Sequence, residues 1–295
     1  MNHTHDQIDH HDLGLAHDLR TLERQAHPRR RALGWLAGAG TLALFGCGGG
    51  SSDSDGTTST TTTGSTGTTP TTTTTGSVGS CSVIPEETAG PYPGDGSNTS
   101  GGSLANALAL SGIVRSDIRA SIAGASGVAA GVPLVVKLRL VNTGSSCADL
   151  SGYAIYLWHC DAVGRYSMYS SGVIGENYLR GVQPTDSSGV ATFTTVFPGC
   201  YSGRMPHIHF EVYRSTTTAS AFSNKLKTSQ LALPTAICSQ VYDNVSDYSA
   251  SIRNLAAISF ATDNVFSDGV SLQLATITGS NNAGYEATLT VGISV

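Results

Sequence analysis

Tyr285-Glu-Ala-Thr-Leu-Thr-Val-Gly-Ile-Ser-Val295, at the C-terminus, is the stretch that indicates the fold most clearly. Apolar side chains stand at every second position and alternate with Glu, Thr, Gly and Ser. Successive side chains of a β-strand point to opposite faces of the sheet, so this period of two predicts a strand with one buried face. A sheet of such strands must bury that face against a second layer, and we therefore expect an all-β domain.

The same alternation recurs within residues 134–140, 154–159 and 191–197. Turn-forming residues separate the runs, as in Gly279-Ser-Asn-Asn-Ala-Gly284. Helical periodicity is sparse, and one short helix is expected near residues 248–257. Together these patterns predict that residues 81–295 form a single antiparallel β-sandwich, which is long enough to enclose a sizeable core.

The composition excludes two classes of protein. Charged residues make up 13% of the 295 residues and the formal net charge is -5, whereas roughly 25% of residues are charged in an average globular protein. No basic cluster outside the N-terminal segment offers a phosphate-binding face, which argues against nucleic-acid binding. The body of the chain has no apolar run of about 18 residues, which excludes a protein with several membrane-spanning helices.

Residues 1–47 resemble a bacterial export signal. Three arginines at 29–31 precede an uncharged run from 32 to 45, which is the order of a signal peptide, and the paired arginines resemble a twin-arginine signal. Leu44-Phe-Gly-Cys47 resembles a lipobox with Cys47 as the lipidated residue. We expect export to the periplasm or the cell surface and a lipid anchor at Cys47; a short buried helix is the alternative.

Residues 48–80 are almost entirely Gly, Ser and Thr. This segment lacks the apolar side chains that would offset the entropy of ordering, so we expect a flexible linker between the anchor and the domain. Five cysteines follow Cys47, and an exported domain permits disulfides, but one thiol of an odd set cannot pair within the chain. The five are Cys81, Cys147, Cys160, Cys200 and Cys238. Cys81 with Cys147 is a guess, and the pairing stays open.

Pro206-His207-Ile208-His209-Phe210-Glu211-Val212 is the stretch with the clearest chemistry. On a strand, His207 and His209 project from the same face and can offer two imidazoles to one metal ion. Two exposed or hydrogen-bonded histidines are the alternative. Tyr201 and Arg204 lie just upstream and favour the metal site.

Further motifs precede and follow this pair in a fixed order. They are Glu87-Thr-Ala-Gly-Pro-Tyr92, Trp158-His-Cys-Asp161, Gly164-Arg-Tyr166, Leu179-Arg-Gly181 and Pro198-Gly-Cys-Tyr201. Taken together with the two histidines, the series resembles the intradiol ring-cleavage dioxygenases, the family of catechol and protocatechuate dioxygenases. The resemblance runs from about residue 81 to the C-terminus and implies the β-sandwich of that family.

The resemblance implies one Fe(III) ion per domain, held by Tyr166, Tyr201, His207 and His209. The residue types suit this ion, because phenolate is a hard anionic donor that stabilises ferric over ferrous iron. A ferrous site would more often use two histidines and a carboxylate, and tyrosine ligands are unusual for zinc.

The implied reaction is cleavage of a catechol-type ring between its two hydroxylated carbons, with both atoms of O₂ incorporated. Tyr201 would release the iron and take up a substrate proton. Arg204 would stabilise negative charge on the ring, unless it is a surface salt-bridge residue. Tyr92 and Gln230 are weaker candidates for contact with the substrate; Tyr92 is as readily a packing residue.

Other residues receive structural interpretations. His159 and Cys160 are neighbours on a strand and point to opposite faces, so they are not expected to form a catalytic dyad. Asp161 and Arg165 are expected to fix the turn before Tyr166. The segment between Tyr201 and His207 is shorter than in many relatives, which predicts a more open pocket and leaves the substrate open. The linker stands where the catechol enzymes have a helical dimerisation region, so the oligomeric state also stays open.

Two functions from other classes remain as alternatives at this stage. One is an exported metal- or phenol-binding β-sandwich without turnover. The other is a carbohydrate- or protein-binding sandwich in which the histidines have no ligand.

Overall fold

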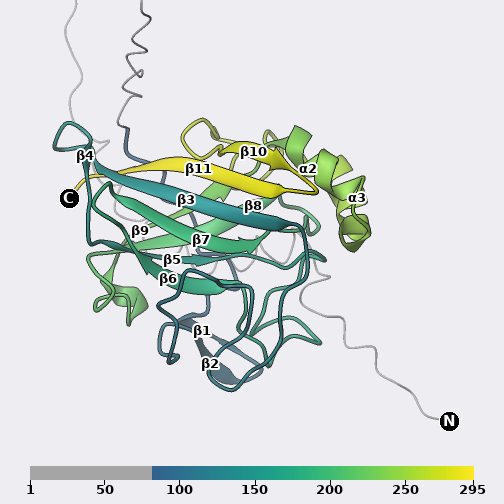
Figure 1. Ribbon diagram of the computed structural model, residues 1–295, viewed down its shortest axis with the longest axis horizontal. Helices are drawn as coiled ribbons and strands as arrows, with labels where there is room; N and C mark the ends of the chain where they lie inside the picture. The colour runs from purple at the N-terminus through teal and green to yellow at the C-terminus, as the bar shows by residue number, and fades with distance from the viewer. Residues whose placement is uncertain (1–81) are drawn as a thin grey trace, which may run out of the picture. The chain divides into compact units, whose positions relative to one another are not determined.

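The computed structural model describes residues 82–295, which form two β-sheets packed face to face (Figure 1). In the first sheet the order is β10-β11-β3-β4, and β7 pairs with residues 133–139 of β3 on the edge opposite β11. These strands are β3 (Pro133–Asn142), β4 (Ala148–Asp149), β7 (Val190–Val196), β10 (Thr276–Ser280) and β11 (Gly284–Ile293). They include three of the four runs that showed alternation in the sequence.

The second sheet has the order β6-β5-β8-β9, with every neighbouring pair antiparallel. Its strands are β5 (Ala154–Trp158), β6 (Arg180–Pro184), β8 (His207–Tyr213) and β9 (Lys225–Ala232). The predicted all-β sandwich is confirmed.

One strand pair departs from the antiparallel expectation. β11 pairs with β3 in parallel, from Tyr285 opposite Leu134 to Ile293 opposite Asn142. Alternation in the sequence tells which face of a strand is buried but not the direction of its neighbour. Parallel neighbours need a long connection, and residues 143–283 supply it.

The apolar core lies between the sheets. Leu134, Val136, Leu138 and Leu140 of β3 are at most 1% exposed, as their alternation predicts. They belong to the same apolar cluster as alternate residues of β5 and β8, namely Ile155, Leu157, Ile208, Phe210 and Val212. The opposite face of β5 is buried as well, in a second cluster that contains Tyr156, Trp158, Tyr166 and Tyr201. The second sheet is therefore covered on both faces.

Two short helices lie together at one end of the sandwich, as Figure 1 shows. They are α2 (Thr235–Tyr242) and α3 (Ser249–Ala256). The 3₁₀ turn η3 (Ser246–Tyr248) leads into α3, and another, η2 (Phe222–Asn224), precedes β9. The predicted helix near residues 248–257 is confirmed as α3, whereas α2 was not predicted. A small hairpin of β1 (Asp95–Ser100) and β2 (Ser103–Asn106) forms a separate two-stranded sheet. No helix in residues 82–295 is long and apolar enough to span a bilayer.

Several sequence-based expectations fall outside residues 82–295. The export signal, Cys47, the linker and Cys81 lie there, so these assignments and the boundary at residue 81 stay predictions. Within the described residues, Cys147 is disulfide-bonded, and Cys160, Cys200 and Cys238 are buried free thiols. At least one unpaired thiol was expected, and the described residues contain three.

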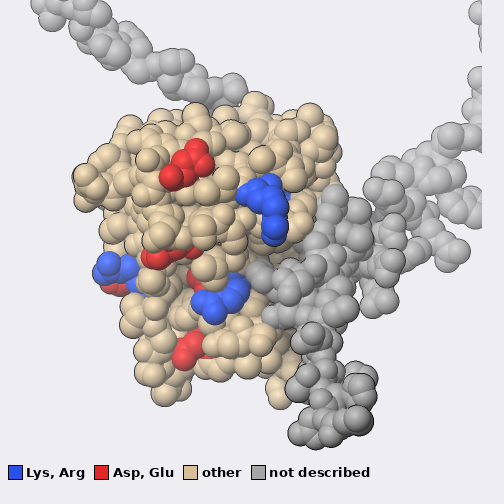
Figure 2. Space-filling view, turned by 90° about the vertical axis from the view of Figure 1, so that its right-hand side faces the viewer, with Lys and Arg blue, Asp and Glu red and all other residues tan. Residues whose placement is uncertain are grey.

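Few charged side chains lie on the face drawn in Figure 2, where basic and acidic residues, some of them side by side, stand on a largely uncharged surface. This is what 13% charged residues lead one to expect. No basic cluster is visible among the described residues on that face.

Candidate metal centre

His207 and His209 lie at the start of β8 and project from the same face of the strand. Both are only 2% exposed. The register of the sheet places His209 opposite Trp158 of β5 on one side and opposite Gln230 of β9 on the other. The predicted pair therefore lies in the middle of a sheet and not on the protein surface.

All four predicted iron ligands meet at this point. The Tyr201 hydroxyl lies 3.3 Å from Nε2 of His207, and Nε2 of His207 lies 3.0 Å from Nε2 of His209. The ring of Tyr166 completes the group, with its centroid 5.8 Å from that of Tyr201 and 6.3 Å from that of His209. Three separate segments of the chain thus supply one compact set of two imidazoles and two phenols.

The turn that carries Tyr201 is fixed by the two helices. The Tyr242 hydroxyl donates to the carbonyl of Pro198 over 2.9 Å, and the Cys200 amide donates to Ser251 Oγ over 2.8 Å. Gly199 approaches a neighbouring chain segment so closely that a Cβ there would lie 2.5 Å from the carbonyl oxygen of Ala162. Only glycine fits this position, which explains the Pro-Gly step before Tyr201.

The turn that carries Tyr166 is closed by Asp161, as predicted. One carboxylate oxygen of Asp161 accepts hydrogen bonds from the amides of Val163 and Arg165, and the other accepts one from Nε of Arg165 over 3.0 Å. The amide of Tyr166 donates to Ser170 Oγ over 3.0 Å. Asp161 and Arg165 are therefore part of the scaffold of the site.

The two histidines are oriented by different means. His207 donates from Nδ1 to the carbonyl of Met205 over 2.5 Å, which leaves the lone pair of Nε2 directed at the other side chains. Nδ1 of His209 has no hydrogen-bond partner in residues 82–295. Its ring instead stacks on Trp158, with centroids 4.9 Å apart and planes 6° from parallel. Gly90 also packs on the His209 ring, because a Cβ at this position would lie only 3.3 Å from Cε1 of His209.

Burial keeps the group uncharged when no cation is bound. It lowers the pKa of both His207 and His209 well below that of a free imidazole, and nearby Arg204 lowers it further. Burial, followed by the neighbouring Tyr201, raises the pKa of Tyr166 well above 10. The buried Tyr166 hydroxyl makes no hydrogen bond of normal length within the described chain.

This donor set fits a hard, highly charged metal ion. Residues 82–295 contain no cluster of three or more His, Cys, Asp or Glu that could hold a metal. The cluster found here instead combines two imidazole nitrogens with two phenols, whose ionisation requires a strong cation. A buried Tyr166 oxygen without a partner is what such a cation would satisfy, and two phenolates favour a ferric ion over zinc.

Arg204 lies beside the four residues and is 3% exposed. Its Nε donates to the carboxylate of Asp263 over 3.0 Å, and its Nη2 donates to Oε1 of Gln230 over 2.7 Å. Burial opposes the charged guanidinium, but Tyr201 and Asp263 outweigh this and raise the pKa of Arg204. The alternative of a surface salt bridge is therefore wrong.

Gln230 and Tyr92, the weaker candidates, also lie at the site. Gln230 is fully buried and, besides accepting from Arg204, donates from Nε2 to the carbonyl of Thr88 over 2.9 Å. The ring of Tyr92 packs on Tyr166, with centroids 4.9 Å apart. Trp158, Gly90 and Asp263 were not singled out from the sequence. The motifs that contain Trp158 and Gly90 were part of the resemblance, but the two residues received no role. Their contacts with His209 depend on the register of the sheet and the path of the backbone, which the sequence does not reveal.

The expectation of an open pocket is not met. Each of the four candidate ligands is at most 8% exposed. The segment that contains Gly90 and Tyr92 packs directly on His209 and Tyr166.

His159 and Cys160 form no dyad, as expected. Nδ1 of His159 contacts the backbone carbonyl of Cys160 at 2.8 Å, and Nε2 contacts Thr195 Oγ1 at 2.7 Å. Burial lowers the pKa of His159 to about 4, and the Cys160 thiol donates to the carbonyl of Gly199. Both residues stabilise the scaffold.

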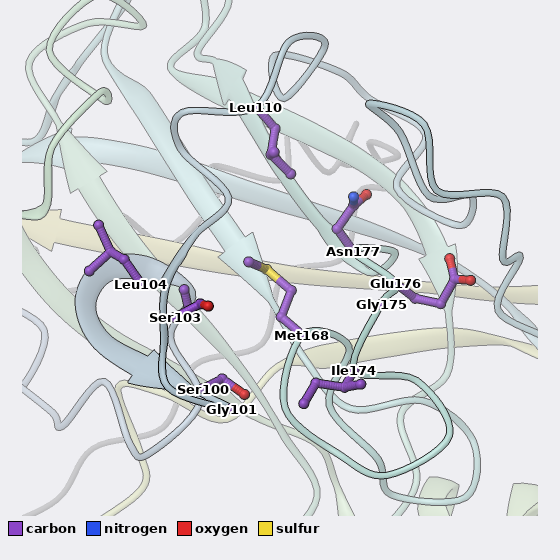
Figure 3. Close-up of a pocket in the computed structure, with 11 residues that line it drawn as sticks. Ser100, Gly101, Ser103, Leu104, Leu110, Met168, Ile174, Gly175, Glu176 and Asn177 are labelled. Atoms are coloured by element: carbon purple, nitrogen blue, oxygen red, sulfur yellow. The ribbon is translucent and has the colours of Figure 1, made fainter.

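A surface pocket of about 360 Å³ lies elsewhere, between the β1–β2 hairpin and residues 168–177 (Figure 3). Apolar side chains of Leu104, Leu110, Met168 and Ile174 line it together with Asn177. It includes none of the candidate site residues. We place the functional site at the histidines because the convergent donors, and not an empty volume, define the chemistry.

Comparisons with known proteins bear on the family and the fold. Residues 116–220 match the model of a protein family described as Dioxygenase. This range contains Tyr166, Tyr201, Arg204 and both histidines. No curated protein sequence matches the chain.

Solved structures with similar architecture are dioxygenases. An intradiol ring-cleavage dioxygenase from Tetranychus urticae has 24% sequence identity, covers 72% of this chain and 95% of its own, and gives a TM-score of 0.53. The dioxygenase domain of a carbohydrate-binding fusion protein from Streptomyces sp. SirexAA-E has 22% identity over 72% of this chain and 99% of its own, with a TM-score of 0.45. A 3-chlorocatechol 1,2-dioxygenase from Rhodococcus opacus 1CP has 16% identity over 70% of each chain, with a TM-score of 0.43.

The fold is therefore that of the intradiol ring-cleavage dioxygenases, and the resemblance read from the sequence is confirmed at the level of fold and of the matched family segment.

Proposed function

We propose that the protein is an Fe(III)-dependent dioxygenase that cleaves a catechol-type ring between its two hydroxylated carbons with O₂. The observation that carries this proposal is the meeting of Tyr166, Tyr201, His207 and His209 in one buried cluster. Bound there, Fe(III) would draw electron density from a coordinated catecholate and so make the ring reactive towards O₂.

The chain's own residues would divide the remaining work. Tyr201 is the most exposed of the four, at 8%, and is therefore the ligand best placed to exchange with a substrate and to take up a proton at its hydroxyl oxygen. The guanidinium of Arg204 is fixed next to it and would stabilise negative charge on the ring. Tyr166 and the two histidines, which are 1–2% exposed, would keep water away from the reacting centre.

A visible absorption spectrum of the purified full-length protein, with iron quantified, tests this proposal. One iron per chain and a phenolate-to-Fe(III) charge-transfer band are expected, and the band should shift when catechol is added. Oxygen uptake and formation of a ring-opened diacid should follow. An iron-loaded protein without the band would contradict the two-phenolate site. A band that shifts without oxygen uptake would favour the binding module without turnover.

We further propose that the protein is exported and attached to a bacterial membrane through a lipid on Cys47. The support is the sequence pattern of residues 1–47 and the Gly/Ser/Thr-rich segment of residues 48–80. Cys47→Ser should move the protein from the membrane fraction of a bacterial host to the soluble fraction, and incorporation of a labelled fatty acid should be lost. Membrane association that survives this substitution would contradict the anchor.

A further inference from the structure

The loop between α3 and β10 sends two buried side chains towards the candidate metal centre. Asp263 is 0% exposed and Phe266 is 1% exposed. The ring of Phe266 lies 6.4 Å from that of His207 and 5.7 Å from the guanidinium carbon of Arg204. This loop lies beyond residues 116–220, the range matched by the family model.

The Asp263 carboxylate is saturated with hydrogen bonds. Oδ2 accepts from Nε of Arg204 over 3.0 Å and from the amide of Met205 over 2.6 Å. Oδ1 accepts from Nε of Arg204 over 3.3 Å and from the amides of Val265 and Phe266 over 2.8 and 3.2 Å. Such a carboxylate has no oxygen to spare for a metal or a substrate, and it fixes its partners in place.

Arg204 is therefore held on three sides. Asp263 takes Nε, Gln230 takes Nη2, and Phe266 lies along the guanidinium. A long side chain with many rotamers keeps one orientation when its hydrogen-bond geometry is specified in this way. The Asp263 charge also balances that of Arg204, which lowers the cost of burying the guanidinium close to a metal ion.

We propose that Asp263 is the positioning residue of this site. It holds the Arg204 guanidinium beside Tyr166 and Tyr201, where negative charge would develop on the ring of the substrate. The inference rests on the proposed function and deepens it, because Asp263 acts on the reaction through Arg204 alone. Removing Asp263 should then slow the reaction only while Arg204 is present.

A double-mutant cycle of Asp263→Asn and Arg204→Gln in the full-length protein tests this dependence. Asp263→Asn should keep one iron per chain and lower kcat/KM for catechol about 30-fold. In the Arg204→Gln background the same substitution should change kcat/KM by less than about threefold. Asp268→Asn is the matched control, because it removes one acidic charge from an exposed position of the same loop and should leave kcat/KM unchanged.

Melting temperatures of the iron-free proteins give a readout that does not depend on turnover. Arg204→Gln leaves a buried carboxylate without its cation and should lower the melting temperature by about 10 °C. Adding Asp263→Asn should restore part of this loss, because the unpaired charge is then gone. If Asp263→Asn alone does not fold, Asp263→Glu, which keeps the charge at a different reach, replaces it in the cycle.

Additive losses in both kcat/KM and melting temperature would overturn the inference, because Asp263 would then act independently of Arg204. This result is distinguishable from failure of the proposed function. A wild-type protein without catechol turnover would contradict the function, and the melting cycle and the dissociation constant of catechol would still decide the role of Asp263.

Discussion

The two ends of β8 present buried polar side chains on the same face but satisfy them differently. His207 and His209 lie at its start, and Glu211 and Tyr213 follow at the same period of two. Glu211 is fully buried, yet its carboxylate accepts a hydrogen bond from the Tyr213 hydroxyl over 2.6 Å and lies 2.7 Å from Nζ of Lys225. The protein supplies donors for the acceptors at this end.

At the histidine end the buried polar groups face one another and are only partly paired. The Nε2 atoms of His207 and His209 lie 3.0 Å apart, and the Tyr201 hydroxyl lies 3.3 Å from Nε2 of His207. The Tyr166 hydroxyl makes no hydrogen bond of normal length within residues 82–295. Buried polar groups left unsatisfied cost stability, so a fold that keeps them needs an external ligand or a functional reason. The difference between the ends separates a structural polar cluster from the site that we propose for a cation.

The largest expected effect comes from removing the phenol hydroxyl of Tyr166 at the histidine end of β8. Tyr166→Phe should weaken iron binding by about 100-fold or more and abolish part of the charge-transfer band, because a direct ligand is lost. The iron-free protein should be as stable as the wild type or more stable by about 1 kcal/mol, because an unpartnered buried hydroxyl is removed. Iron titration and thermal melting measure the two effects.

Tyr213→Phe is the matched control at the other end of the strand. It should leave iron binding unchanged and lower the free energy of unfolding by about 1–2 kcal/mol, because Glu211 loses a donor. If both substitutions reduced stability and neither reduced iron binding, the distinction between the two ends would be wrong.

Gly90→Ala should have an intermediate effect that sharpens the comparison at His209. The residue has φ +70°, and its new Cβ would lie 3.3 Å from Cε1 of His209, the imidazole that is held by stacking and not by a hydrogen bond at Nδ1. Backbone strain should cost about 1 kcal/mol, and displacement of the ring should weaken iron binding about 10-fold.

Gly152→Ala separates the two contributions. Gly152 has φ +77°, but a Cβ there would meet nothing within 4 Å. It should show the same loss of stability with unchanged iron affinity. Equal iron affinities for the two variants would mean that glycine is required at position 90 only for its positive φ and not for its contact with His209.

How far the sequence predicts this molecule depends on the range of each interaction. Alternation identified β3, β7 and β11, because burial of one face leaves a period of two in the chain itself. The strand β5 was also predicted, although both of its faces are buried. The parallel direction of β11 and the helix α2 were not predicted, because both depend on contacts between distant segments.

The candidate site shows the same division. The spacing of His207 and His209 predicts their shared face from geometry, and the resemblance supplied Tyr166, Tyr201 and Arg204. Asp263 could not be found in this way: it is a single acid in an irregular loop, 59 positions after the arginine that it binds. A buried cation requires a counter-charge, but the sequence does not tell which carboxylate supplies it.

The smallest expected effect concerns Glu87, a half-buried acid near the histidine end. Burial, and next the neighbouring Asp268, raise the pKa of Glu87 to about 7, although Gln273 donates to its carboxylate over 3.2 Å. Because the folded pKa lies above the usual 4.5, the native state holds a proton that the unfolded state has released. The stability from this proton is complete below pH 4.5 and is lost as the pH rises through about 7.

Glu87→Gln keeps a neutral side chain at every pH and should remove this dependence. The variant and the wild type should melt at similar temperatures at about pH 4.5, and the variant should be more stable by roughly 1 kcal/mol at pH 8, a value reduced for solvent screening at a half-exposed group. Asp268→Asn should narrow the pH range over which this stability is lost, because it removes a charge that contributes to the raised pKa of Glu87. If the melting temperatures of the wild type and Glu87→Gln change in parallel from pH 4.5 to 8, Glu87 ionises as a solvated acid. It would then belong to neither of the two buried polar groups at the ends of β8.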